Sequence, residues 1–99
     1  MKLTEERINE LISRGANRWT KGQHDRLYIN PETVGLECDY YNTGNIRYAA
    51  LKGEEISNSR ANKIRASKVY IDINSGKLVN TSTDPAYIEA VNEFIGGLV

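Results

Sequence analysis

The stretch from Gly35 to Leu51 constrains the fold of this chain most strongly, because apolar and polar residues alternate along it in two runs. Alternation with a period of two is typical of β-strands that bury one face. The two runs meet at residues 42–45, where Gly44 suits a turn that needs a positive φ. The sequence therefore predicts a β-hairpin. Its first strand would place Leu36, Cys38 and Tyr40 on one face, and its second strand would place Ile46, Tyr48 and Ala50 on one face.

Patterns on either side of the hairpin predict an α+β fold. Helical patterns cover residues 4–14, a short basic segment at 57–67, and an amphipathic segment from Asp84 to Gly96 and Gly97. Strand patterns cover residues 25–30, 68–73 and, more briefly, 78–79, whereas segment 15–22 is assigned no strand. Because strands that follow one another tend to be neighbours, we expect one domain over residues 1–99. It would hold a small antiparallel sheet of four to five strands in a β-meander, with the helices on one face.

The overall charge argues against a protein that works mainly by wrapping nucleic acid, because 13 basic residues balance 13 acidic ones. The charges are nevertheless unevenly spread. Residues 45–70 contain six basic and two acidic residues, and acidic residues dominate from residue 71 onward. A local contact with phosphates therefore stays open.

The motifs of common enzymes are missing. The chain has one cysteine, Cys38, and one histidine, His24, which is too few for an internal disulfide or a structural zinc site. His24 next to Asp25 resembles a base with its orienting carboxylate, but neighbours in a strand point to opposite faces. We therefore assign no catalytic residue, no metal ligand and no cofactor, and binding is favoured over catalysis.

The sequence also favours a cytoplasmic protein with no membrane association. No apolar run approaches the ~20 residues that a membrane-spanning helix needs. The first ten residues contain acidic side chains where a signal peptide requires an apolar core.

Aromatic and cationic residues at exposed positions are the strongest functional signal. Six tyrosines accompany one tryptophan, and Tyr, Trp and Arg are enriched where proteins recognise partners. Trp19 could stack on a base or cover the core as an edge aromatic, and the cations of segment 57–67 could contact phosphates or be solvated. The open face of the sheet is expected to collect Arg26, Tyr28, Glu37, Asp39, Tyr41, Arg47, Lys68 and Tyr70. The candidate binding residues are Trp19, Lys21, Arg26, Tyr28, Tyr41, Arg47, Arg60, Lys63, Arg65 and Tyr70.

Three strings carry a resemblance to known proteins: RWTKGQHDRLYIN (18–30), TGNIRYAALKGEEISN (43–58) and KVYIDINSGK (68–77). They resemble small proteins carried by bacterial phages and mobile elements, some of which inhibit host defence, including anti-CRISPR proteins. The resemblance implies a compact accessory protein that acts by binding, often as a homo-oligomer. It implies no catalytic residue.

Three functions stay open from the sequence. In the first, the chain binds a nucleic acid, a nucleotide or a host-defence protein through its Tyr and Arg face, and replacing Arg47 or Arg60 by alanine weakens binding. In the second, it is a metal-dependent nuclease that nicks DNA with Asp25 and either Asp39 or Asp72. In the third, it is a structural interaction module that dimerises through its last helix, around Phe94.

Overall fold

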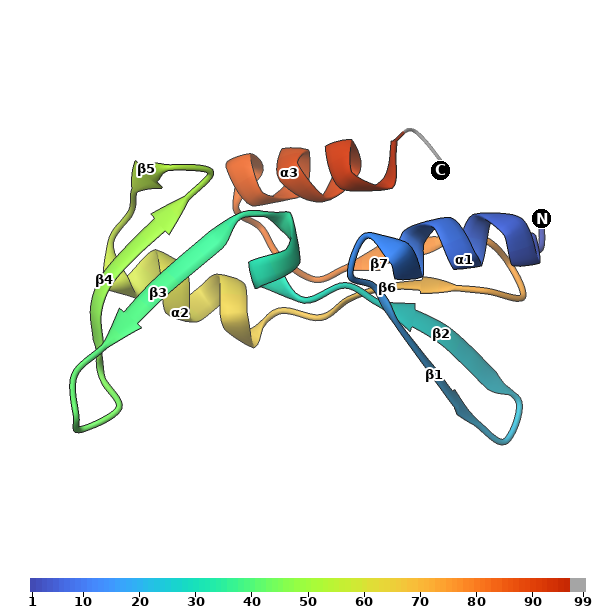
Figure 1. Ribbon diagram of the computed structural model, residues 1–99, viewed down its shortest axis with the longest axis horizontal. Helices are drawn as coiled ribbons and strands as arrows, with labels where there is room; N and C mark the ends of the chain where they lie inside the picture. Colours follow the sequence, from blue (N-terminus) through green and yellow to red (C-terminus); the bar gives the residue numbers. More distant parts are fainter. Residues whose placement is uncertain (97–99) are drawn as a thin grey trace.

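Residues 1–96 form three α-helices and two small antiparallel sheets, which confirms the predicted α+β class. The computed structural model describes residues 1–96 (Figure 1), so Gly97, predicted at the helix end, lies outside the described part. The helices are α1 (Glu5–Ser13), α2 (Asn58–Ala66) and α3 (Pro85–Ile95), with a short 3-10 helix η1 (Pro31–Val34). The strands are β1 (Asn17–Lys21), β2 (His24–Tyr28), β3 (Leu36–Tyr40), β4 (Ile46–Leu51), β5 (Glu54–Glu55), β6 (Val69–Asp72) and β7 (Leu78–Asn80).

The strands divide between two sheets and do not form the single meander that we expected. The first sheet has the order β1-β2-β6-β7, and the second has the order β3-β4-β5. β6 occupies the edge of β2 that β3 would need in a meander, with Tyr28 opposite Tyr70. The ladder continues beyond β2, because the N–H of Ile29 donates to the carbonyl of Val69 at 3.0 Å. The hairpin β3–β4 must therefore build a sheet of its own.

The strand β1 was missed by the sequence analysis. It pairs with β2 along its whole length, from Asn17 opposite Tyr28 to Lys21 opposite His24. All five of its side chains are exposed, so it lacks the buried apolar residues that produce an alternating pattern. Gly22 has a φ of +59° in the tight turn that follows. The hairpin β1–β2 projects from the body of the protein, diverging from the hairpin β3–β4 (Figure 1).

The predicted hairpin at residues 36–51 is confirmed, but a β-bulge changes which residues share a face. Tyr40 pairs with Ile46 whereas Asp39 pairs with Tyr48, so Arg47 is an extra residue on β4. The bulge turns Tyr48 outward and leaves Ile46 buried on the same side as Ala49. Tyr48 and Ala50 share a face as expected, but the expectation that Ile46 shares it was wrong.

Residues from the first helix, from the first sheet and from the last helix share one hydrophobic core within the described part of the chain. Ile8 and Leu11 of α1 belong to the same buried cluster as Leu27 of β2 and Ile71 of β6. α3 contributes the residues of its apolar face, Tyr87, Ala90, Val91 and Ile95. Burial raises the pKa of the Tyr87 hydroxyl to about 12. The apolar face of α3, which could also have been a dimer contact, is thus part of the core of the monomer.

Side chains satisfy both ends of α3 and join this helix to its neighbours. Asp84, where the helix was predicted to start, is its N-cap and accepts the N–H of Tyr87 at 3.2 Å. The same carboxylate binds the guanidinium of Arg60 through two contacts, at 2.8 and 3.1 Å. At the other end, Arg7 of α1 and Arg14, the C-cap residue of α1, donate to the last carbonyls, those of Ile95 and Phe94. These contacts join α3 to α2 and to α1.

We expect Asp84→Ala to lower the free energy of unfolding by about 1–2 kcal/mol at neutral pH, because both the cap and the ion pair are lost. Asp84→Asn keeps a capping oxygen and should cost less than about 1 kcal/mol. Urea unfolding of the three proteins, followed by circular dichroism, measures both differences.

The loss of unfolding free energy caused by Asp84→Asn should also depend on pH. The hydrogen bonds from Arg60 are the main cause that lowers the pKa of Asp84 in the folded state. Its ionised form therefore stabilises the fold above the unfolded pKa of about 3.9, and this contribution disappears as the pH falls through the lower folded pKa. The difference between wild type and Asp84→Asn should shrink between pH 6 and pH 3. A difference that stays constant over this range would contradict the role of the ion pair.

Candidate functional site

The outer face of the sheet β1-β2-β6-β7 collects aromatic and cationic side chains. Strand pairing places Trp19 opposite Arg26, and Tyr28 opposite Tyr70. Directly paired residues lie on the same face of a sheet. Leu27 lies on the other face, where it is fully buried in the core. Trp19, Arg26, Tyr28 and Tyr70 therefore form one surface patch, which we call the aromatic–arginine cluster.

Arg26 lies at the centre of this cluster. Its guanidinium carbon is 4.4 Å from the ring centroid of Tyr70 and 5.7 Å from that of Trp19, within the range of a cation–π interaction. It also donates a hydrogen bond of 3.0 Å to the hydroxyl of Tyr28. That hydrogen bond is the main cause that raises the pKa of Arg26, which keeps the positive charge. The cluster thus holds a permanent cation among three rings.

The three rings also contact one another. The centroids of Tyr28 and Tyr70 are 5.2 Å apart with tilted planes, and Trp19 meets Tyr28 edge-on at 6.1 Å. Such geometries are favourable for aromatic pairs. Trp19 nevertheless keeps 40% of its surface exposed. The cluster is therefore ordered before any ligand arrives, and ring surface is still accessible.

Further side chains extend the outer face at both ends. His24 stacks on Trp19, with ring centroids 6.4 Å apart and planes inclined by 22°. Lys21 pairs with His24 on this face, next to the tip of the hairpin. Lys68 precedes Tyr70 by two positions, so it lies on the same side of the chain. His24 and Lys68 were not among the candidate binding residues. Lys68 was already expected on the open face, and a strict period of two from Arg26 would also have found His24.

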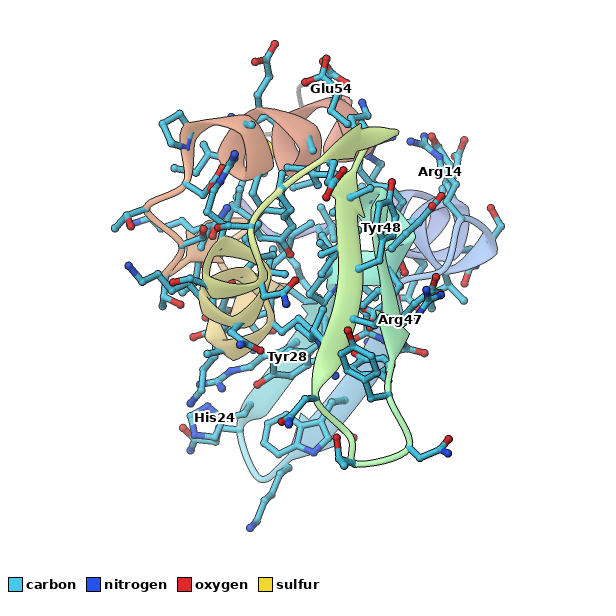
Figure 2. All side chains as sticks on the ribbon, turned by 90° about the vertical axis from the view of Figure 1, so that its left-hand side faces the viewer. Arg14, His24, Tyr28, Arg47, Tyr48 and Glu54 are labelled. Carbon is cyan, nitrogen blue, oxygen red and sulfur yellow. The ribbon has the colours of Figure 1, made fainter. Side chains whose placement is uncertain are left out.

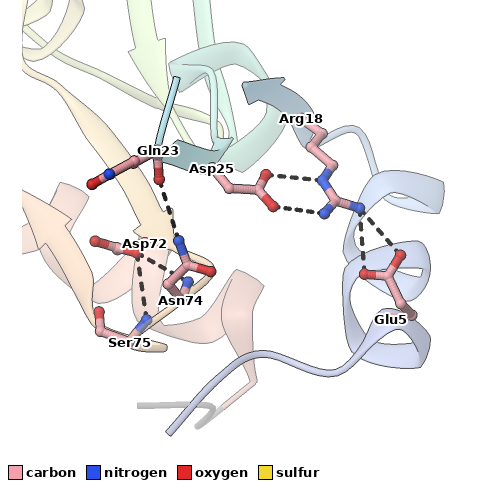
Figure 3. A network of polar contacts seen from close by, with 7 residues as sticks. All are labelled: Glu5, Arg18, Gln23, Asp25, Asp72, Asn74 and Ser75. Atoms are coloured by element: carbon pink, nitrogen blue, oxygen red, sulfur yellow. Dashed lines mark hydrogen bonds and ion pairs between the residues drawn. The ribbon is translucent and has the colours of Figure 1, made fainter. Parts of the chain in front are cut away.

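The opposite side of the hairpin is fixed to α1 by an ion network (Figure 3). Arg18 binds Asp25 through two contacts, at 3.0 and 2.7 Å, and reaches Glu5 of α1 at 3.2 Å. The hydrogen bonds from Arg18 are the main cause that lowers the pKa of Asp25. Near the hairpin tip, the amide of Asn74 donates to the carbonyl of Gln23 at 3.4 Å. These contacts hold the projecting hairpin, and with it the cluster, in place.

The remaining candidate residues lie elsewhere or already have partners. Tyr41 and Arg47 belong to the hairpin β3–β4, so the expected single open face is divided between two sheets. Figure 2 shows Arg47 and Tyr48 on that hairpin, apart from His24 and Tyr28. Arg60 is bound to Asp84, and the guanidinium of Arg65 lies 5.2 Å from the ring of Tyr40. Lys63 lines a surface pocket beside α2.

The carboxylates proposed for a nuclease do not converge. Asp39 lies on the second sheet, where it pairs with Arg47 at 3.2 Å. Asp25 and Asp72 lie on opposite faces of the first sheet, and Asp72 accepts the N–H groups of its own turn at 3.0 and 3.4 Å. Residues 1–96 contain no group of three His, Cys, Asp or Glu residues that could hold a metal ion. Cys38 is half-buried against the core.

His24 and Asp25 also fail to form a catalytic pair. His24 stacks on Trp19 on the outer face, whereas the carboxylate of Asp25 binds Arg18 toward α1.

No helix in the described part of the chain is long and apolar enough to cross a membrane.

Comparison with known protein families, curated protein sequences and solved structures finds no match. The outer face of the sheet β1-β2-β6-β7 offers ring surfaces for stacking, a central guanidinium and flanking amines.

The exposure of Trp19 leads to a test of its role. We expect Trp19→Ala to lower the free energy of unfolding by only about 1 kcal/mol, because much of the ring is already in water. Leu27→Ala, its neighbour on the buried face, should cost about 2–5 kcal/mol. Urea unfolding compares the two variants. An equal loss for both would mean that Trp19 is a core residue, in contradiction to a binding role.

Proposed function

We propose that this protein binds single-stranded nucleic acid on the outer face of the sheet β1-β2-β6-β7. The observation that carries the proposal is the aromatic–arginine cluster, in which Arg26 contacts Trp19, Tyr28 and Tyr70. Stacking on an aromatic ring contributes about 1–3 kcal/mol per base and depends little on sequence. An exposed tryptophan on a fixed hairpin is suited to that contact.

The charges of this face support the proposal, although the whole chain is neutral. Lys21, Arg26 and Lys68 supply three positive charges beside the rings, and Asp72 is the acidic residue opposite Arg26. The Asp72 carboxylate accepts two backbone N–H groups of its turn, which partly neutralise it. A strand laid across the rings would therefore meet cations that can contact its phosphates.

A single strand fits this face better than a duplex. The rings lie on a four-stranded sheet, and the bases of a duplex are already stacked on their neighbours. An unpaired base can turn its face toward Trp19 without the cost of unstacking a duplex. The nuclease alternative lacks a comparable arrangement, because Asp25 and Asp72 each have structural partners.

A host-defence protein is the second candidate partner. Trp, Tyr and Arg residues gathered in one patch are also typical of the residues that dominate protein interfaces. A phage or mobile-element origin, an anti-CRISPR activity and a homo-oligomer follow only from the resemblance given above, and we retain them as proposals. Binding of nucleic acid or of a defence protein would each suit such an accessory protein.

The first test is a titration with short oligonucleotides. Single-stranded DNA should quench the fluorescence of Trp19, the only tryptophan, and an equal length of duplex should do so less. If about three phosphates are contacted, raising the salt from 50 to 200 mM should weaken binding roughly tenfold to twentyfold. Unchanged fluorescence with both DNAs would contradict binding of nucleic acid and favour a protein partner.

Matched variants then locate the binding face. With a dye-labelled oligonucleotide followed by anisotropy, Trp19→Ala should weaken binding by about fivefold or more, since a stacked base is lost. Arg26→Gln should also weaken it and reduce the salt dependence. Tyr41→Ala and Arg47→Gln remove the same kinds of side chain from the second sheet and should leave binding within about twofold. Equal losses for both pairs would contradict the assignment of this face.

A further inference from the structure

A surface pocket lies at the end of the outer face, beyond Tyr70. It has a volume of about 520 Å³ and is formed by α2, the connection to β6, and the segment before α3. The N–H of Lys68 donates to the hydroxyl of Thr81 at 2.7 Å, and the N–H of Thr81 returns a bond to the carbonyl of Lys68 at 3.0 Å. Thr81 therefore continues the pairing of β6 with β7 and lines the pocket. Tyr70 is only two residues from Lys68, about 7 Å along the strand.

The lining of this pocket suits an anion. Its polar residues are two cations, four hydroxyl residues and one carboxylate: Arg60, Lys63, Ser67, Thr81, Ser82, Thr83 and Asp84. The carboxylate is matched by Arg60 at 2.8 Å. Lys63 has no ion-pair partner among residues 1–96. The pocket therefore keeps one positive charge, that of Lys63, which no carboxylate of its lining neutralises.

The same lining is unsuited to a nucleobase. Its apolar residues are Ala66 and Pro85, and none of its side chains is aromatic. Stacking, which holds bases on the rings of the cluster, has no counterpart here. The N-terminus of α3 is already capped by Asp84 through the N–H of Tyr87. The hydroxyl groups of Ser67 and Thr81 already donate to the carbonyls of Ile64 and Lys68. The donors that the pocket still offers are thus Lys63 and the hydroxyl groups of Ser82 and Thr83.

We infer that this pocket binds the terminal phosphate monoester of a nucleic-acid strand that lies across the aromatic–arginine cluster. The inference rests on the proposed function and adds a preference for a phosphorylated end. A terminal monoester carries a charge of about −1.5 to −2 and three acceptor oxygens, whereas an internal diester carries one charge. The ammonium of Lys63 and the two available hydroxyl groups, those of Ser82 and Thr83, favour the monoester.

The test compares three oligonucleotides of one sequence: a 5′-phosphorylated, a 3′-phosphorylated and an unphosphorylated strand, each with an internal dye. Anisotropy titrations at fixed salt give the ratio of affinities. We expect one phosphorylated strand to bind about tenfold more tightly than the unphosphorylated one, the effect of one charge-assisted contact. The preferred end, 5′ or 3′, shows in which orientation the oligonucleotide lies across the sheet.

Two lysine variants assign the preference to the pocket. Lys63→Gln should bring the affinity ratio close to one, whereas Lys77→Gln, which removes an exposed lysine from the turn before β7, should keep it. Thr83→Val should reduce the ratio without changing any charge. A preference that survives in Lys63→Gln would overturn the pocket as its origin.

The outcomes separate this inference from the function on which it rests. If all three strands bind equally in the wild type, and binding still depends on Trp19, the pocket proposal fails and the binding face stands. If no strand binds and the fluorescence of Trp19 does not change, both fail.

Discussion

The pairing of β2 with β6 is the constraint on which the rest of the structure depends. It joins two strands that are far apart in the chain, although the hairpin β3–β4 and the helix α2 lie between them. Closing such a loop costs conformational entropy. The burial of Leu27 and Ile71 against Ile8 and Leu11 of α1 offsets this cost, because each leaves water completely. The same pairing sets Tyr70 beside Tyr28 and completes the aromatic–arginine cluster.

The two sides of the hairpin β1–β2 make different contacts. On the side of α1, Arg18 binds Asp25 and Glu5 and fixes the hairpin to the body of the protein. On the outer side, Arg26 holds the rings of Trp19 and Tyr70 around it. A surface whose side chains are already ordered loses less entropy when a ligand binds. In the proposed binding mode, the ion network would therefore contribute to recognition without touching the ligand.

Local patterns predicted much of this fold correctly. The turn at Gly44 and the alternation around it predicted β3–β4, and Asp84 with Pro85 predicted the start of α3. Local patterns failed where the structure depends on distant contacts. Alternation indicates which side of a strand is buried, but it does not indicate which strand pairs with it. The sequence therefore suggested one meander in place of two sheets, and the bulge at Arg47, which reverses the alternation of β4, left no signal.

For the candidate site, the sequence by itself determined the chemistry, because the Tyr, Trp and Arg residues and their spacing of two decide what one side of a strand can offer. Tertiary structure decided which of these residues act together. It gathered Trp19, Arg26, Tyr28 and Tyr70, placed Tyr41 and Arg47 on another sheet, and engaged Arg60 and Arg65 with Asp84 and Tyr40. The physical reason is that backbone geometry repeats every two or 3.6 residues and can be read locally, whereas the pairing of distant segments depends on the balance of buried area against loop entropy over the whole chain.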